Sequence, residues 1–196
     1  GITLVISPLI ALMNDQIMKL PPELPAVCLN SHLSTAETAK ACMAVIQNQV
    51  KIIFISPERL CSTSFRNLIA QLHFKYGQDY VSLLCIDEAH CLSHWSYHFR
   101  PAFLRISREI DQIRPKSVLA LTATASDLVC EDILQHLKIK SSCREKELGF
   151  MKINEVRDNL HLCALFCDSE ERKRQRLTNI LSSSLKKGAN LSNIYV

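Results

Sequence analysis

The sequence has few glycines and lacks long apolar runs. Only 4 of its 196 residues are glycine, and the phosphate-binding loop G-x-x-x-x-G-K-[ST] occurs nowhere in it. No apolar stretch approaches the roughly 20 residues that span a bilayer. The apolar start at 1–6 has no basic leader of the kind that opens a signal peptide. A content of 47% hydrophobic and 21% charged residues instead predicts a soluble globular protein.

Motifs that would pair the nine cysteines or bind a metal through them are also missing. There is no C-x-x-C pair, and the nearest spacing, Cys163 to Cys167, has no second pair to match it. Cys28 and Cys85 lie in strand-like apolar runs, and Cys42 lies in a helical pattern. We therefore expect reduced, mostly buried thiols, as is usual in a cytosolic or nuclear compartment.

Neither positive nor negative side chains are in large excess. The formal net charge of +4 favours nucleic-acid contact only weakly, because it is too small to argue binding by charge alone. The densest run, EERKRQR at 170–176, could contact phosphate. The solvated face of a helix that ends near Leu185 is the more ordinary interpretation.

The chain does contain a regular alternation of apolar runs and helical patterns. Strands are predicted at 2–6, 26–29, 51–55, 81–86 and 118–121. Helices are predicted at 9–20, 35–47, 65–72, 102–113, 127–137 and from 170 onward. Pro8 is the expected start of the first helix, Ser34 with Glu37 predicts a capping box, and Ser126 or Asp127 is the expected cap of the fifth. This alternation predicts a three-layer α/β domain with a mostly parallel sheet.

The most informative stretch is 81–86 followed by Asp87-Glu88-Ala89-His90. An apolar run bounded by polar residues predicts a strand buried on both faces, as in parallel sheets that bind ligands at the carboxyl ends of their strands. Asp87 would then hold Mg²⁺ through water, and Glu88 would orient or deprotonate an attacking water. An acidic strand end that caps a helix is the alternative. The apolar strand before the pair and the stretch after it favour the metal-binding interpretation.

Two other predicted strands end in the same dipeptide, Ser7-Pro8 and Ser56-Pro57. Together they would put two hydroxyls and two helix starts on one edge of the sheet. Helix N-terminal amides and hydroxyls bind phosphate without reading sequence. Two ordinary capped helices are the competing interpretation.

The stretch DEAHCLSHWSYHFRP at 87–101 resembles the RecQ family of DNA helicases, and its second half is similar to that family's aromatic-rich loop. Three further stretches resemble helicase motifs in the family's order: TLVISPLIALMNDQ at 3–16, SPERL at 56–60 and LALTATAS at 119–126.

Two more stretches are closest to the Rothmund–Thomson branch of that family. They are HFRPAFLR at 98–105 and DNLHL at 158–162. The resemblance covers roughly residues 1–165. One departure is His94, because the family usually has glutamine just before the loop tryptophan.

The resemblance implies an ATP-driven motor that separates DNA strands in the 3′ to 5′ direction. It implies ATP and Mg²⁺ as cofactors, single-stranded and partly duplex DNA as partner, and a nuclear role in DNA replication, recombination and repair. It identifies no protein partner and no membrane. Two alternatives remain open. One is a superfamily-2 RNA helicase, which the tryptophan-containing loop disfavours, and the other is a non-catalytic DNA-binding fragment, which the absent P-loop favours.

The resemblance also implies roles for individual residues. Catalysis would rest on Asp87, Glu88 and His90, and the nucleotide side would include Asp87, Glu88, Thr122 and Thr124. The residues that would contact DNA are Ser7, Pro8, Asn14, Ser56, Pro57, Arg59, Trp95, Phe99 and Arg100.

The resemblance finally implies a domain organisation. We expect a first RecA-like helicase domain at 1–140, a connection between lobes at 141–190, and the first strand of a second RecA-like lobe at 191–196. In the family the P-loop lies shortly before a strand such as 2–6. We therefore expect a fragment truncated at both ends that does not hydrolyse ATP by itself.

Overall fold

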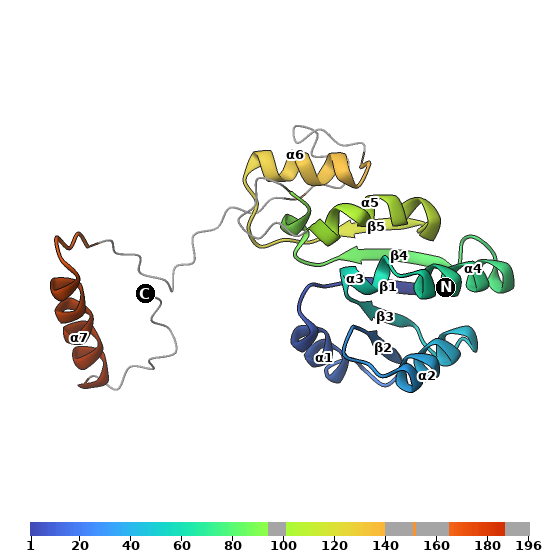
Figure 1. Cartoon of the computed structure of the whole chain (residues 1–196), viewed down its shortest axis with the longest axis horizontal. Helices are drawn as coiled ribbons and strands as arrows, with labels where there is room; N and C mark the ends of the chain where they lie inside the picture. Colours follow the sequence, from blue (N-terminus) through green and yellow to red (C-terminus); the bar gives the residue numbers. More distant parts are fainter. Residues whose placement is uncertain (94–100, 140–150, 152–164, 187–196) are drawn as a thin grey trace. The chain divides into compact units, whose positions relative to one another are not determined.

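The structure is a computed structural model that describes residues 1–93, 101–139, 151 and 165–186 (Figure 1). The chain divides into two compact units, Gly1–Met151 and Lys152–Val196. Every strand of the described residues belongs to the first unit. The predicted active-site residues that the structure describes lie in that unit as well.

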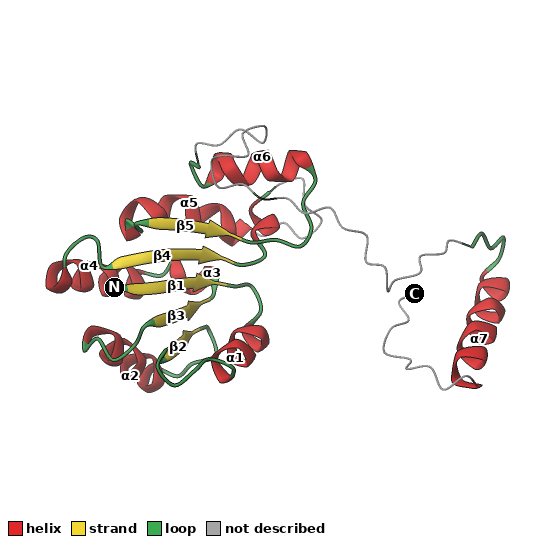
Figure 2. Cartoon of the chain, turned by 180° about the vertical axis from the view of Figure 1, so that it is seen from behind, coloured by secondary structure: helices red, strands yellow, loops and turns green. Residues whose placement is uncertain are grey.

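The first unit is built on a five-stranded sheet (Figure 2). Its strands are β1 (Ile2–Ile6), β2 (Ala26–Leu29), β3 (Ile52–Ile55), β4 (Val81–Ile86) and β5 (Ser117–Ala120). They lie in the order β2-β3-β1-β4-β5, and every neighbouring pair is parallel. The predicted α/β fold is therefore confirmed. Because all strands point the same way, their carboxyl ends form a single edge of the sheet.

Helices connect these strands and cover the sheet. They are α1 (Ile10–Met18), α2 (Thr35–Ile46), α3 (Pro57–Leu60), α4 (Thr63–Tyr76), α5 (Pro101–Ile113) and α6 (Asp127–His136), with a short 3₁₀ turn η1 at Ala89–Leu92. Right-handed crossovers place α2 to α5 on one face of the sheet and α1 on the other. The reason is that the connection from β1 to β2 through α1 runs along the sheet in the opposite direction to the later connections. Figures 1 and 2 agree that α5 covers one face of β5.

The core lies where the central strands meet these helices. Leu4 and Ile6 of β1 are fully buried, as are Leu84 and Ile86 of β4. The other face of β1 is only half-buried, and β5 is alternately exposed and half-buried. The prediction of burial on both faces therefore holds for the end of β4, where Cys85 is also buried, but not for the whole sheet.

Local capping explains where two of the helices begin. The Ser34 hydroxyl accepts a hydrogen bond from the Glu37 amide at 3.3 Å, and the Glu37 carboxylate accepts one from the Ser34 amide at 2.9 Å. The predicted capping box is thus confirmed. The Ser34 hydroxyl also donates to the Glu37 carboxylate at 2.6 Å, and this bond, followed by the one from the Ser34 amide, lowers the pKa of Glu37. Ser126 caps α6 by accepting from the Val129 amide.

The start of α1 differs from the prediction. The helix begins at Ile10, and Pro8 lies in a bend two residues earlier. Leu9 occupies the cap position and has no side chain that can accept a hydrogen bond there. At the second Ser-Pro pair, by contrast, Ser56 caps α3 and Pro57 stands at its first position.

The second unit contains the helix α7 (Glu170–Lys186), which confirms the helix predicted from residue 170. Its arginines and glutamates are exposed, as expected of a solvated face. The strand expected at 191–196 lies wholly outside the described residues. The extent of the predicted segments 1–140 and 141–190 stays a prediction. No described helix has the length and apolarity that a bilayer crossing requires.

Candidate functional site

Asp87 stands at the end of β4 and is fixed by the neighbouring strand. Its amide donates to the carbonyl of Ile6 at 2.9 Å, which extends the pairing of β4 with β1. Its Oδ1 accepts the Glu88 amide at 3.0 Å, and its Oδ2 accepts the Ser7 hydroxyl at 3.4 Å. A carboxylate has about four lone-pair positions, so these two bonds leave capacity for water or a metal ion.

Glu88 follows in a left-handed backbone conformation with φ 53°. Such a conformation is unfavourable for a residue other than glycine and persists only where the surrounding structure fixes it. It turns the chain out of β4 into η1. The Glu88 side chain is 33% exposed, so its carboxylate is accessible to solvent at this edge of the sheet.

His90 links this carboxylate to the end of β5. The side chain of His90 is 10% exposed, and its Nδ1 lies 3.1 Å from Oε2 of Glu88 and 3.0 Å from Oγ1 of Thr122. Thr122 donates its hydroxyl proton to the Thr124 carbonyl and accepts the Thr124 amide, each at 3.2 Å. Its remaining role toward His90 is that of an acceptor. We therefore assign the proton to Nδ1, from which His90 donates toward Glu88 and Thr122.

Backbone hydrogen bonds hold the same two segments together. The Ala89 amide donates to the Leu121 carbonyl at 2.8 Å, and the Leu121 amide donates to the Ile86 carbonyl at 2.9 Å. The pairing of β4 with β5 thus continues past both strand ends. Backbone and side-chain hydrogen bonds therefore join the turn that carries Glu88 to the Thr122 segment.

The predicted DNA-contact residues fall into separate environments. Ser7 is fully buried and directed at Asp87, and Ser56 is 4% exposed and occupied in capping α3. Neither hydroxyl faces solvent as a phosphate ligand would. Asn14 on α1 is exposed, and Arg59 on α3 is half-buried.

The remaining predicted DNA contacts are less well placed or lie elsewhere. Pro8 is half-buried and Pro57 is buried. Trp95, Phe99 and Arg100 lie outside the described residues. DNA contact by all of these residues stays a prediction.

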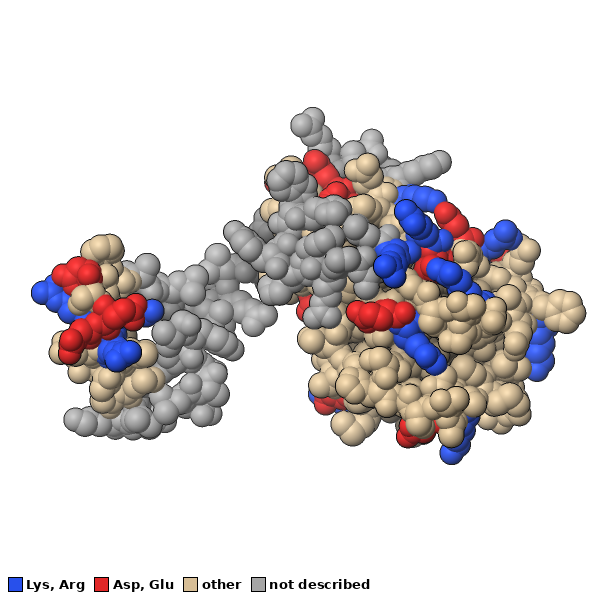
Figure 3. All heavy atoms as spheres, viewed as in Figure 1, with Lys and Arg blue, Asp and Glu red and all other residues tan. Residues whose placement is uncertain are grey.

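Charges of both signs alternate on the layer formed by α3, α4 and α5. Arg66 and Arg105 lie near Cys61 together with Glu58 and Glu109. Figure 3 likewise shows basic side chains with acidic ones among them on the face drawn. Charge on this surface therefore does not identify a nucleic-acid site by itself.

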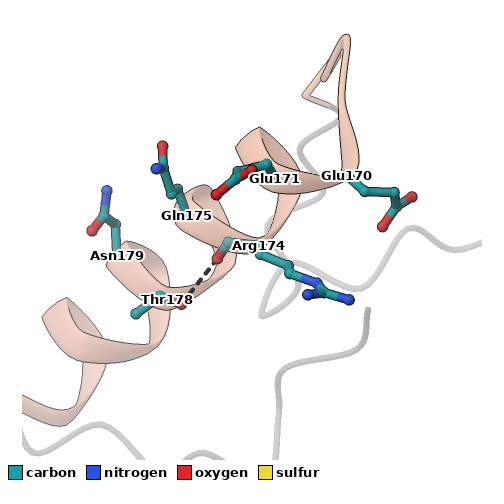
Figure 4. Close-up of a pocket in the computed structure, with 6 residues that line it drawn as sticks. All are labelled: Glu170, Glu171, Arg174, Gln175, Thr178 and Asn179. Carbon is teal, nitrogen blue, oxygen red and sulfur yellow. Dashed lines mark hydrogen bonds between the residues drawn. The ribbon is translucent and has the colours of Figure 1, made fainter.

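A hollow also lies along α7, in the second unit. Figure 4 shows six residues that line it, all from this one helix: Glu170, Glu171, Arg174, Gln175, Thr178 and Asn179. Thr178 donates to the Arg174 carbonyl at 2.9 Å. One exposed helix with mixed charge presents no converging set of groups, so we assign no function to this hollow.

The cysteines of the described residues are free, and no group of three or more His, Cys, Asp or Glu side chains gathers there as a metal cluster would. Burial raises the pKa of the Cys85 thiol, and the charge of nearby Asp87 raises it further. Burial also raises the pKa of Cys28, Cys42 and Cys61. Asp87 remains a carboxylate suited to Mg²⁺ held through water, which needs few protein ligands.

Sequence reasoning missed two polar residues beside this site. Ser93, at the end of η1, donates to Asp132 Oδ2 on α6 at 2.8 Å. Ser93 belongs to the recognised stretch 87–101, but Asp132 belongs to no motif. Nothing in the sequence pairs these two residues, which lie 39 positions apart. The Ser7–Asp87 contact was missed for the same reason, since it spans 80 positions.

Comparison with known proteins identifies the family. The model of the DEAD/DEAH box helicase family matches residues 1–133. ATP-dependent DNA helicase Q-like 5 of Arabidopsis thaliana is 33% identical over 83% of this chain and 17% of its own length. ATP-dependent DNA helicase Q4 of Homo sapiens is 37% identical over 70% of this chain and 11% of its own.

ATP-dependent DNA helicase RecQ of Synechocystis is 35% identical over 95% of this chain and 38% of its own. Among solved structures, the Pyrococcus furiosus Hef helicase domain has 22% identity and a TM-score of 0.45, over 72% of this chain and 28% of that one. The chain thus spans well under half the length of these relatives. Since the family model covers more than half of the chain, the protein belongs to the DEAD/DEAH box helicases, a family that uses ATP, and is related to RecQ DNA helicases.

Proposed function

We propose that this chain is part of an ATP-dependent 3′ to 5′ DNA helicase of the RecQ family, closest to its Rothmund–Thomson branch. We infer that it acts in the nucleus, in DNA replication, recombination and repair. The observation that carries the enzymatic part is the carboxylate–imidazole–hydroxyl chain from Glu88 through His90 to Thr122. It stands at the carboxyl edge of a parallel sheet, where such folds bind nucleotides.

In this proposal each residue has a distinct task. Asp87, held by Ile6 and Ser7, would hold Mg²⁺ through water. The ion, when bound, neutralises charge that develops on the transferred phosphoryl group. Glu88 orients the attacking water and accepts its proton. The Nδ1–H of His90 fixes the Glu88 carboxylate and keeps it aligned with the Thr122 segment.

ATP hydrolysis by the helicase that contains this chain tests the proposal. We expect DNA to stimulate the wild-type enzyme. Glu88→Gln should retain ATP and Mg²⁺ binding and lose turnover by about 10²-fold or more. Asp87→Asn should instead raise the Mg²⁺ concentration that activity requires. Glu23→Gln, at an exposed glutamate in the turn before β2, is the matched control. Near-normal turnover in Glu88→Gln would remove Glu88 as the catalytic carboxylate.

The same assay tests DNA coupling. We propose, from the resemblance alone, that Trp95 stacks on a base, at roughly 1–3 kcal/mol per base. Trp95→Ala or Arg100→Ala should then leave basal ATPase nearly intact and abolish most DNA stimulation and unwinding. His94→Gln should be tolerated. Stimulation by RNA in place of DNA would favour the RNA helicase alternative instead.

A further inference from the structure

The turn that carries Glu88 and His90 is held at both ends by contacts from other elements. Just before it, the Asp87 amide donates to the Ile6 carbonyl of β1 at 2.9 Å, and within it the Ala89 amide donates to the Leu121 carbonyl at 2.8 Å. After it stands Ser93, which is fully buried. A left-handed Glu88 requires such fixed points on either side, because its backbone conformation is unfavourable in isolation.

Ser93 owes its position to α6. Its hydroxyl donates to Oδ2 of Asp132 at 2.8 Å, the length of a well-formed hydrogen bond to a carboxylate. The other carboxylate oxygen, Oδ1, lies 3.8 Å from Nε2 of His136 one turn along the helix. A hydrogen bond to a charged acceptor is stronger than one between neutral groups, so this contact is well suited to fix the backbone of a buried turn.

The helix that presents Asp132 is itself firmly placed. Val129, Cys130 and Ile133 of α6 are buried, and α6 packs against η1. Within η1, the Cys91 amide donates to the Glu88 carbonyl at 2.9 Å and the Ser93 amide donates to the His90 carbonyl at 3.1 Å. The position of Ser93 therefore affects the last hydrogen bond of the turn, from the Ser93 amide to the carbonyl of His90. His90 is the residue that faces Glu88.

We propose that Asp132 is a positioning residue for the Glu88 carboxylate and acts through Ser93. By holding the end of η1, it keeps His90 against Glu88 and Thr122 in the arrangement that catalysis requires. Asp132 itself touches neither nucleotide nor metal in this role. The proposal rests on the proposed ATPase function for its catalytic consequence, but the effect on the turn can be measured without nucleotide.

The first experiment measures ATP hydrolysis by the helicase that contains this chain. Ser93→Ala and Asp132→Ala should each lower kcat about 10-fold while the KM for ATP changes less than about 2-fold, because a displaced catalytic group lowers turnover more than binding. The double variant should be no slower than either single one, since both changes remove the same hydrogen bond. Asp132→Asn keeps an oxygen acceptor and should retain most of the activity. Glu131→Gln removes a neighbouring exposed carboxylate of α6 and is the control.

The second experiment measures hydrogen exchange of the Cys91 and Ser93 amides in the same proteins without nucleotide. Exchange at these amides should accelerate in Ser93→Ala and Asp132→Ala and stay unchanged in Glu131→Gln. Full kcat in the two alanine variants of an active enzyme would overturn the positioning role. Faster exchange throughout α2, α4 and the sheet would also overturn it, since it would show that the contact only stabilises the domain. An inactive wild-type helicase would refute the proposed function, and the exchange data would then still decide whether Asp132 holds the turn.

Discussion

The imidazole Nδ1 of His90 lies 3.1 Å from Oε2 of Glu88. The same nitrogen lies 3.0 Å from the Thr122 hydroxyl, so a single N–H is directed between the end of β4 and the segment after β5. Two chain segments that no local sequence pattern connects are thereby joined at the point where we propose that hydrolysis occurs. Movement of one segment can change the orientation of the carboxylate on the other.

Removal of the Thr122 hydroxyl tests this linkage. Thr122→Val has nearly the same shape but no acceptor for Nδ1, so His90 should hold Glu88 less well. We expect kcat for ATP hydrolysis to fall about 10-fold, less than the roughly 10²–10⁴-fold contribution of a general acid or base itself, because Thr122 acts only through His90. KM should change little. Steady-state kinetics of the helicase measures this, with Thr38→Val on α2 as the control. An unchanged kcat would mean that His90 is held by its other contacts.

Most elements of the first unit could be predicted because each depends on residues close together in the sequence, although the short turn η1 was not. The apolar run 81–86 formed β4, and the Ser34–Glu37 pair formed a capping box at α2. Both signals are local, as the period of a strand and the four residues of a cap require. The prediction that Pro8 starts a helix was wrong, because the Ser7 hydroxyl before it donates to Asp87 and does not cap α1.

Contacts across the sheet could not be predicted in the same way. Ser7 meets Asp87 only because β1 lies next to β4, and strand order is not written in any one segment. Ser93 meets Asp132 only because α6 packs on η1. The resemblance supplied Thr122 as a nucleotide-side residue, but it did not supply the hydrogen bond to His90. The sequence thus identifies residues of the site, whereas only the fold shows which of them contact one another.

Ser7 separates two interpretations of the first Ser-Pro pair. Its hydroxyl is buried and donates to Asp87 across 3.4 Å, a long and therefore weak bond. Ser7→Ala should raise the Mg²⁺ concentration required for half-maximal ATPase by a few-fold, since a net bond of this kind contributes about 1 kcal/mol or less. DNA affinity should stay unchanged, and Ser31→Ala, at an exposed serine, should alter neither property. Weaker DNA binding with a normal Mg²⁺ requirement would support the phosphate-contact interpretation.

The buried thiols should be unreactive in the folded chain. Burial and the charge of Asp87 raise the pKa of Cys85, so less thiolate is present at a given pH than in the unfolded chain. At pH 8 iodoacetamide should label Cys85 far more slowly in buffer than in urea. Stability should fall as the pH rises above about 9, the ordinary pKa of a cysteine thiol, because only the unfolded thiol then ionises. Mass spectrometry measures the labelling of Cys85. Equal rates in buffer and in urea would contradict its buried position.

The ion pair between Arg66 and Glu109 should stabilise the packing of α4 on α5. The Arg66 guanidinium donates through Nε to Oε2 at 2.9 Å and through Nη2 to Oε1 at 2.5 Å, a bidentate contact. Glu109 is only 3% exposed, whereas the Arg66 side chain is 44% exposed. Arg66→Ala would therefore leave a buried carboxylate without its cation, which costs more than the pair itself contributes.

Urea unfolding of three variants of this chain separates two contributions to stability. One is the free-energy cost of an unpaired buried carboxylate at Glu109, and the other is the stabilisation that the ion pair itself provides. Arg66→Ala should lower the unfolding midpoint more than Arg105→Ala does, because Arg105 is exposed on α5. The double variant Arg66→Met with Glu109→Leu should recover more than half of the loss, since apolar side chains of similar volume need no counter-charge. A double variant as unstable as Arg66→Ala would show instead that the two hydrogen bonds themselves, and not the unpaired carboxylate, account for the effect.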